Sequence, residues 1–467
     1  MIGRKGDSTM TRKFALALVA IVFAVGCAGP SKLTDKSEQK LAGGNAWGAW
    51  QLATRALDKE PGNPRARAAA TAAGASIAQE WQRKVHALAQ VDSVNAADEV
   101  LRLADFRVSA ARYATIPVGA DWPQEERTLL GAAARYHYQR GVDAANSGRP
   151  KKAFAEYADA ERYVPGYRDV VKRSDRALGE ALTRVALVPF RASSEDAKLG
   201  VEVAQAWRDN LLQNLAPPAA PFTRILGDDA IERSMTISEL EGLSREQAIR
   251  FGRKAGAHRV VWGSIGKIRS STKMNFFRDM VARRVMVREA NGTESSRWVE
   301  VPIEVVARVR DVTVGVDYEV IAVKSGVSIA HRHFDRSTSA RVVWTSQQLD
   351  GDPTSYSLVS ETVRVSNPDR VKDVETRWKS VCGDATTLAQ VIQARRSAGS
   401  SGRYARESLP RFLAGAAFVF LEDLPPAEDL AYAALAQGSA PLRDDLLRLD
   451  AIDDVDLGTE TSGALSR

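Results

Sequence analysis

The chain contains 467 residues, of which 44% are hydrophobic and 26% are charged. This composition is near the globular average and suits two or three domains with real cores, so a disordered, collagenous or multi-span membrane protein is excluded. The basic excess is small, with 65 Lys and Arg against 58 Asp and Glu, and the charges are interspersed. We therefore expect no nucleic-acid partner. Two cysteines and five histidines leave no material for a multi-cysteine metal site or a disulfide framework.

The N-terminus has the pattern of a bacterial lipoprotein signal peptide. Two basic residues after Met10, which is an alternative start, precede an apolar run at 14–25 that is too short for a permanent membrane helix. The small residues directly before Cys27 resemble a lipobox, which implies removal of residues 1–26 and acylation of Cys27. Ala28 is not the aspartate that would favour the inner membrane, so we expect an outer-membrane anchor facing the periplasm. An ordinary signal peptide with an incidental cysteine is the alternative.

Residues 27–182 are predicted to form an α-helical domain, because apolar residues recur there at three- and four-residue spacing. One segment carries the small, aromatic and proline positions of a tetratricopeptide repeat, namely Gly141, Ala153, Tyr157, Ala160 and Pro165. We expect Tyr157 to lie between two helices whose small residues approach closely, and Pro165 to end the second helix. A weaker copy lies at 44–61.

Residues 65–114 show helical periodicity without the repeat signature, so the domain is predicted to be a tetratricopeptide-like bundle with degenerate middle units. Such a bundle could offer a groove for a peptide or protein partner. A purely structural helical arm is an equally good interpretation.

The pattern changes at Thr183, where a predicted α/β domain, residues 183–368, begins. Short apolar runs predict strands, and amphipathic stretches between them predict helices. In chain order we expect a strand at 185–190, a helix at 203–215, a strand at 222–226, a helix from Asp228, a capping-box helix from Ser244 and a strand within 255–263. This order implies a parallel or mixed sheet with helices packed against it.

These segments resemble those of a family of envelope lipoproteins. The runs VALVPF, FTRIL and GAHRVVWGSI resemble the periplasmic α/β domain of the curli secretion lipoprotein CsgG, an outline shared by LpoB and the TolB N-terminal domain. Residues 330–345 resemble the late hairpin of this family, with Ala340 in place of the usual glycine. The resemblance covers about 183–346. It implies a protein that acts by assembly or by contacting partners, without catalysis.

A long β-rich insertion occupies residues 273–323. Asn291 and Gly292 are a two-residue hairpin signal, and pairing around them would place Arg283 opposite Glu300. Both faces of this predicted hairpin carry charges, which disfavours insertion into a bilayer and favours a water-exposed extension of the sheet.

The second strand of this insertion alternates apolar and polar residues, but its apolar phase changes between 301–309 and 312–320. A β-bulge near Arg310 would produce that change.

The candidate catalytic and metal-binding residues lie apart in the sequence. His331 and His333 share one strand face, a geometry able to hold Zn²⁺ or Cu²⁺, but no local acid or cysteine completes a site, so half-exposed strand residues are expected. His258 is interpreted as a loop residue, and Cys382 as a buried structural thiol. Ser264 lacks the flanking pattern of a nucleophile elbow. We therefore expect no catalytic, cofactor-binding or metal site, and no enzyme activity.

Residues 369–467 are predicted to be a C-terminal helical region. Helices are expected at 371–381, 386–396 and 409–424, the last buried or covered by a partner, and the acidic segment 450–460 is expected to be a solvated tail.

Together these patterns predict an α+β multidomain protein with an N-terminal tetratricopeptide-like bundle, a central mixed-sheet domain with an extended hairpin, and a C-terminal helical region. The expected function is a non-enzymatic scaffold that is anchored in the outer membrane through Cys27 and binds an envelope protein, with homo-oligomerisation also open. The alternatives are a CsgG-type oligomeric secretion channel, an activator of a peptidoglycan synthase, and an enzyme whose site is not locally encoded.

Overall fold

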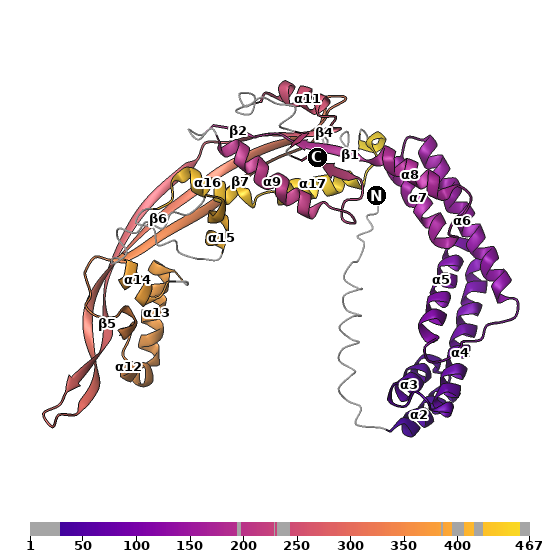
Figure 1. Ribbon diagram of the computed structural model, residues 1–467, viewed down its shortest axis with the longest axis horizontal. Coiled ribbons are helices and arrows are strands. Elements are labelled where there is room, and N and C mark those ends of the chain that lie inside the picture. Colours follow the sequence, from indigo (N-terminus) through magenta and orange to yellow (C-terminus); the bar gives the residue numbers. More distant parts are fainter. Residues whose placement is uncertain are drawn as a thin grey trace. The chain divides into compact units, whose positions relative to one another are not determined.

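The computed structural model describes residues 29–193, 198–227, 229–230, 243–383, 386–394, 406–414 and 424–457. It contains many helices and one mixed sheet with an extended hairpin, which confirms the expected α+β class (Figure 1). The chain divides into two compact units, Met1–Glu180 and Ala181–Arg467, called below the helical unit and the sheet unit. The predicted signal peptide, most of the helix expected from Asp228, and residues 458–467 lie outside the described residues.

Consecutive helices pack against one another in the helical unit. Short polar residues begin several of them, as where the Asn45, Asn63 and Asp92 side chains accept backbone N–H groups of the first turn. Between the helices the core is rich in fully buried alanines, which allow close approach. The helices are α2 Pro30–Ala42, α3 Ala46–Lys59, α4 Pro64–Ala89, α5 Ser93–Ala110, α6 Trp122–Asn146, α7 Pro150–Tyr163 and α8 Val170–Ala181.

Tyr157 lies between α6 and α7, as predicted. Its side chain is 1% exposed, and a Cβ built on Gly141 would come within 2.5 Å of its ring. Only glycine at that position lets the ring lie directly on the α6 backbone. Helix α7 ends at Tyr163, before Pro165, as predicted. The weaker copy also forms a helix pair, α2 and α3.

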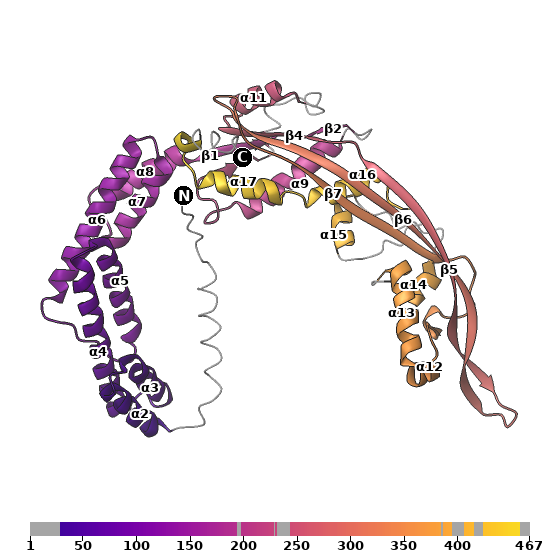
Figure 2. The ribbon, with the colours of Figure 1, turned by 180° about the vertical axis from the view of Figure 1, so that it is seen from behind.

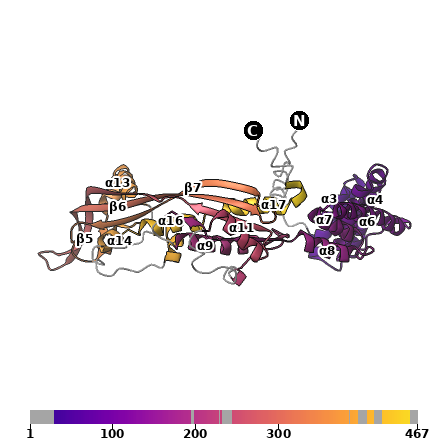
Figure 3. The ribbon, with the colours of Figure 1, turned by 90° about the horizontal axis from the view of Figure 1, so that it is seen from above.

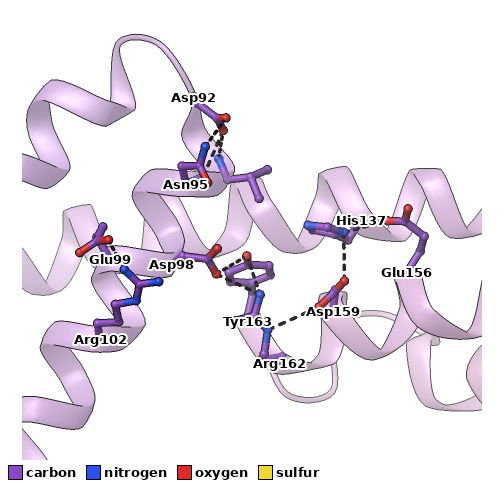
Figure 4. A network of polar contacts seen from close by, with 11 residues as sticks. Asp92, Asn95, Asp98, Glu99, Arg102, His137, Glu156, Asp159, Arg162 and Tyr163 are labelled. Carbon is purple, nitrogen blue, oxygen red and sulfur yellow. Dashed lines mark hydrogen bonds and ion pairs between the residues drawn. The ribbon is translucent and has the colours of Figure 1, made fainter. Parts of the chain in front are cut away.

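A polar network joins α5, α6 and α7 (Figure 4). The Tyr163 hydroxyl and the Arg162 guanidinium donate to Asp98 at 2.6 Å and 3.0 Å. Burial acts to raise the pKa of Asp98, but these hydrogen bonds outweigh it and lower that pKa. On α6, His137 Nδ1 lies 2.8 Å from Glu156 Oε2 of α7. The network therefore holds the α6–α7 pair against α5.

The sheet unit is built on one mixed sheet of order β3-β1-β4-β6-β5-β8, with β7 paired to β6 and β2 to β4. Strands β1, β3 and β4 are parallel to one another, whereas β4, β5, β6, β7 and β8 pair antiparallel. The predicted mixed sheet is therefore confirmed. The hairpin expected at 330–345 is wrong, because these residues lie within one strand, β7, which pairs continuously with the long strand β6 and makes no turn there. The strands are β1 Thr183–Leu187, β2 Arg191–Ala192, β3 Thr223–Ile225, β4 Arg259–Ile265, β5 Arg269–Arg288, β6 Glu294–Ala322, β7 Ser328–Thr345 and β8 Tyr356–Ser357.

Helices cover both faces of this sheet (Figure 2). One face packs against α9 (Leu199–Asn214), α16 (Ala427–Ala436) and α17 (Ala440–Asp450), where Trp207 Nε1 donates to the Leu435 carbonyl at 2.6 Å. The opposite face packs against α11 (Arg245–Lys254) near β4, and α11 begins with the predicted capping box between Ser244 and Gln247. Near the hairpin that opposite face is covered by α13 (Pro368–Cys382) and α14 (Leu388–Ala394). The sheet unit also contains two short α-helices, α12 (Glu361–Ser366) and α15 (Leu409–Ala414). Helix α15 is the start of the helix expected at 409–424, of which residues 415–423 lie outside the described residues.

The hairpin forms at the predicted turn, but the predicted register is wrong by one residue. Arg283 pairs with Val299 and not with Glu300. The hydrogen bond that closes the turn encloses three residues, 290–292, and among them only Gly292 has a positive φ, of 83°. A two-residue type I′ turn, the type that Asn-Gly favours, would need positive φ at both central positions, whereas a three-residue loop needs it only at the last.

The predicted bulge near Arg310 is also wrong. Strand β6 pairs without interruption there, and its register shift lies between Val320 and Ile321. The apolar phase changes because the covered face changes: Val305 packs with α13 and α14 on one face, and Val312 packs with the core under α9 on the other. Successive strand residues point to opposite faces, so a straight strand that serves two cores shifts its apolar phase without a bulge.

The expectation of a solvated tail at 450–460 is wrong for Asp450 and Asp453, which are buried, whereas Asp454 and Val455 are exposed. Asp450 is buried and accepts the Thr223 hydroxyl at 2.7 Å. Asp454 accepts Nη2 of the buried Arg259 at 2.7 Å. A buried guanidinium or hydroxyl is costly without an acceptor, so these carboxylates stabilise the end of the sheet.

Candidate functional site: the exposed face of the long hairpin

In the distal part of the hairpin, helix α13 covers one face of β5. There Trp378 of α13 packs edge-on against Phe277 of β5, with ring centroids 5.0 Å apart. Asp279 of β5 accepts both Trp378 Nε1, at 2.9 Å, and the Arg377 guanidinium, at 2.7 Å. Helix α13 is therefore held on this face by packing and by charge-assisted hydrogen bonds.

The other face of the same stretch of β5 exposes large apolar side chains. These are Met274, Phe276, Met280 and Met286, with exposed fractions of 50%, 63%, 42% and 65%. Even-numbered residues share one face of a strand, so the four side chains form a row, which we call the hairpin stripe. Arg278, the buried Ala282 and Arg284 lie on the same face and interrupt this row. Large apolar side chains exposed together on one face are still typical of an interaction surface.

Arginine and carboxylate side chains accompany the stripe. Arg278, between Phe276 and Met280 on the same face, donates to Glu304 at 2.8 Å. The hydrogen bonds from Arg278 and Ser346 lower the pKa of Glu304, so this carboxylate stays ionised at neutral pH. Methionine, aromatic residues and arginine are the residue types enriched at protein interfaces.

The outer edge of β5 offers a second binding element beside the stripe. Strand β8 pairs with it only at Ala282 and Arg283. Over 269–281, no strand of the described part of the chain pairs with that edge. The outer edge of β7 likewise has no strand beside it among the described residues. Unpaired edges can add a strand from a partner, so this region can dock a protein by backbone pairing and by apolar contact.

Sequence reasoning did not single out the stripe. Phe276 and Phe277 are adjacent and point to opposite faces, so the apolar residues of β5 show no clean alternation. The even spacing of Met274, Phe276 and Met280 indicates that they share one face of a strand. This spacing could not indicate which face of the strand α13 would cover.

The predicted site residues are not brought together. Cys27, the predicted lipid attachment site, lies outside the described residues. His331 and His333 share one face of β7 as predicted, with side chains 60% and 59% exposed, and His333 Nδ1 lies 3.0 Å from Asp317 Oδ1. In the described part of the chain no group of three or more side chains is placed to hold a metal ion.

The remaining candidates have structural surroundings. His258 precedes β4, where its Nδ1 accepts the Arg184 backbone N–H at 3.1 Å. Burial, followed by the charge of Arg184, lowers the pKa of His258. Ser264 lies within β4. Cys382 is buried at the end of α13, as predicted, and burial raises the pKa of its thiol to about 12.

Within the described residues, no helix has the length and apolar character needed to span a membrane. In comparisons with known proteins, no family model matches the chain and no curated protein is significantly similar to it.

Proposed function

We propose that this protein is a non-enzymatic scaffold of the bacterial envelope. Cys27 would tether it by lipid to the periplasmic face of the outer membrane, and an envelope protein would bind to the sheet unit. The observation that carries this proposal is the hairpin stripe, whose four large apolar side chains are 42–65% exposed beside an unpaired strand edge. The lipobox-like pattern before Cys27 supports the compartment.

The helical unit supports the same role. Its α6–α7 pair has the small and aromatic contacts of a tetratricopeptide-like unit, with Tyr157 against Gly141. Stacked helix pairs of this type present surfaces to peptides and proteins. The sequence resemblance to CsgG, LpoB and TolB domains places activation of a peptidoglycan synthase among the roles that such a scaffold could have.

A CsgG-type secretion channel is the second candidate, favoured by the unpaired edges of β5 and β7. The charges of the hairpin weigh against it. With the observed register, one face of the distal hairpin carries Arg283 and Arg297, and the other carries Arg284 and Arg288. An arginine facing lipid costs about 2–4 kcal/mol at the bilayer midplane, so neither face suits the hydrocarbon. We therefore favour a water-exposed hairpin.

Site-specific photocrosslinking tests the scaffold directly. A photoreactive amino acid at position 276, in place of Phe276, should capture an envelope protein in cells, because this side chain is the largest exposed member of the stripe. The matched control is position 275, where the exposed Asn275 points to the opposite face. Equal capture at both positions, or none at 276, would contradict the assignment of this face.

Two further measurements separate the anchor and the channel from the scaffold. Mass spectrometry of the mature N-terminus should show an acylated Cys27, and Cys27→Ser should release the protein from the outer membrane or leave it unprocessed. Purified lipidated protein should give no discrete conductance in planar bilayers. Channels that disappear when residues 283–300 are deleted would favour the secretion channel over the scaffold.

A further inference from the structure

A second surface of the sheet unit is an open polar groove of 900 Å³ between α9 and the C-terminal helices. The first wall is α9, whose Gln205, Asp209 and Gln213 are exposed at intervals of four residues and so form one row along the helix. Helices α9 and α16 pack against each other and lie side by side when the molecule is seen from above (Figure 3).

The opposite wall comes from three helices that are far from α9 in sequence. Its residues are Glu407, Pro410, Arg411, Tyr432, Ala436, Gln437, Ser439, Ala440 and Arg443. The walls are tied together at the floor, where Ser439 Oγ lies 2.7 Å from Asn210 Oδ1 and Trp207 Nε1 donates to the Leu435 carbonyl. The groove is thus preorganised by the core, which lowers the entropic cost of binding.

The charges that line the groove disfavour polyanionic and polycationic ligands. Carboxylates come from Glu202, Asp209 and Glu407, and guanidinium groups from Arg411 and Arg443. The two signs are interspersed, so the groove favours neither a polyanion nor a polycation.

The uncharged lining points to a specific chemistry. Gln205, Gln213 and Gln437 carry side-chain amides, which offer both donors and acceptors, as sugar hydroxyl groups do. The apolar part comprises alanines, Pro410 and Tyr432, and the Tyr432 side chain is buried with Arg406 over its ring. A peptide ligand is usually held by large apolar anchor side chains, and the residues of this lining offer little apolar surface for them. The C–H faces of sugar rings need only shallow apolar contacts.

We propose that this groove binds a neutral oligosaccharide, with the Gln205–Asp209–Gln213 row of α9 as the hydrogen-bonding wall. The volume of 900 Å³ is near the upper end of the range for small-ligand sites, so several sugar units fit. This inference does not depend on the hairpin stripe or on the lipid anchor.

Isothermal titration calorimetry on the full-length protein tests the proposal, with chitotetraose, cellotetraose and maltotetraose as neutral probes. At least one of them should bind, and the double variant Gln205→Ala/Gln213→Ala should weaken its binding about tenfold, as for two lost neutral hydrogen bonds. Alanine is well tolerated on an exposed helix face, so the variant should fold. Gln348→Ala, at an exposed position outside the groove, is the matched control and should bind normally.

Three outcomes would overturn the proposal: no binding of any tetrasaccharide, binding that the double variant leaves unchanged, or equal loss in Gln348→Ala. A tetra-alanine peptide with an acetylated N-terminus and an amidated C-terminus, which is uncharged, gives the competing arm. If this peptide binds at Gln205 and Gln213 and the sugars do not, the groove is a peptide site and the oligosaccharide assignment is wrong.

Discussion

Replacing Asp445 by alanine should destabilise the sheet unit by about 3 kcal/mol. Asp445 of α17 is 3% exposed and accepts three hydrogen bonds of 2.8 Å, one from the Tyr318 hydroxyl and two from the Arg332 guanidinium. Losing charge-assisted bonds costs about 1.5–3 kcal/mol, and the buried Tyr318 hydroxyl left without an acceptor adds about 1–3 kcal/mol. Arg332 is 51% exposed and can return to water, which holds the total near the lower end of the summed range of about 2.5–6 kcal/mol.

Native-state hydrogen exchange with mass spectrometry measures this loss locally. Peptides from α17 and β7 should lose protection in Asp445→Ala, whereas peptides from the helical unit should not. The matched control is Asp444→Ala, because Asp444 is the adjacent residue, is exposed, and forms an ion pair with the neighbouring Arg443. Its effect should stay within about 0.5 kcal/mol. A loss below about 1 kcal/mol in Asp445→Ala would refute the inferred clamp.

The same carboxylate predicts a dependence on pH. Burial by itself would raise the pKa of Asp445, but the hydrogen bonds from Arg332 and Tyr318 outweigh it and lower that pKa. A carboxylate whose folded pKa is lowered stabilises the protein above its unfolded pKa of about 3.9, and this stabilisation is lost as the pH falls through the folded pKa. The free energy of unfolding of the sheet unit should therefore drop below about pH 4. In Asp445→Asn this acid-dependent drop should be smaller, and an unchanged pH profile would contradict the assignment.

Three further changes test the packing. Tyr157→Ala should cost the helical unit about 3–5 kcal/mol in urea denaturation, as for a large buried aromatic, and a cost below about 1 kcal/mol would show that the ring is not in the core. Gly200→Ala should prevent stable folding of the sheet unit, because the added Cβ would lie 1.8 Å from the Phe190 carbonyl oxygen. Gly179→Ala adds a Cβ with nothing within 4 Å and should stabilise α8 by about 0.5–1 kcal/mol. Similar shifts of the melting temperature for the two variants would be inconsistent with these contacts. Cys382 should resist an aromatic disulfide reagent in the native protein at pH 8 and react once urea unfolds it, since burial raises the pKa of its thiol to about 12, and fast native labelling would argue against a buried thiol.

Local features of the chain were predicted correctly where neighbouring residues decide them. The capping box at Ser244 formed because its partner, Gln247, is three residues away. Tyr157 was placed between α6 and α7 because glycine and alanine at repeat positions permit close helix packing. In both cases the interaction lies within one helix or one helix pair.

The register of the hairpin could not be predicted from neighbouring residues. Asn291 and Gly292 located the turn, but the choice between a two-residue and a three-residue loop set the register, and the same dipeptide is compatible with both. The difference of one residue moved Glu300 from the face of Arg283 to the opposite face.

The sequence by itself determined the α+β class, the places of strands β1, β3 and β4 and of the helices between them, and the position of the hairpin turn, because these depend on hydrophobic periodicity and turn residues a few positions apart. Only the tertiary structure decided which face of β6 each core covers, which acidic residues of the C-terminus are buried, and that Phe276 is exposed while Phe277 is covered. Those outcomes depend on contacts between residues about 100 to 230 positions apart, such as Trp378 with Asp279 and Asp450 with Thr223. Periodicity along the chain carries no information about such distant partners, and so it could reveal neither the hairpin stripe nor the groove beside α9.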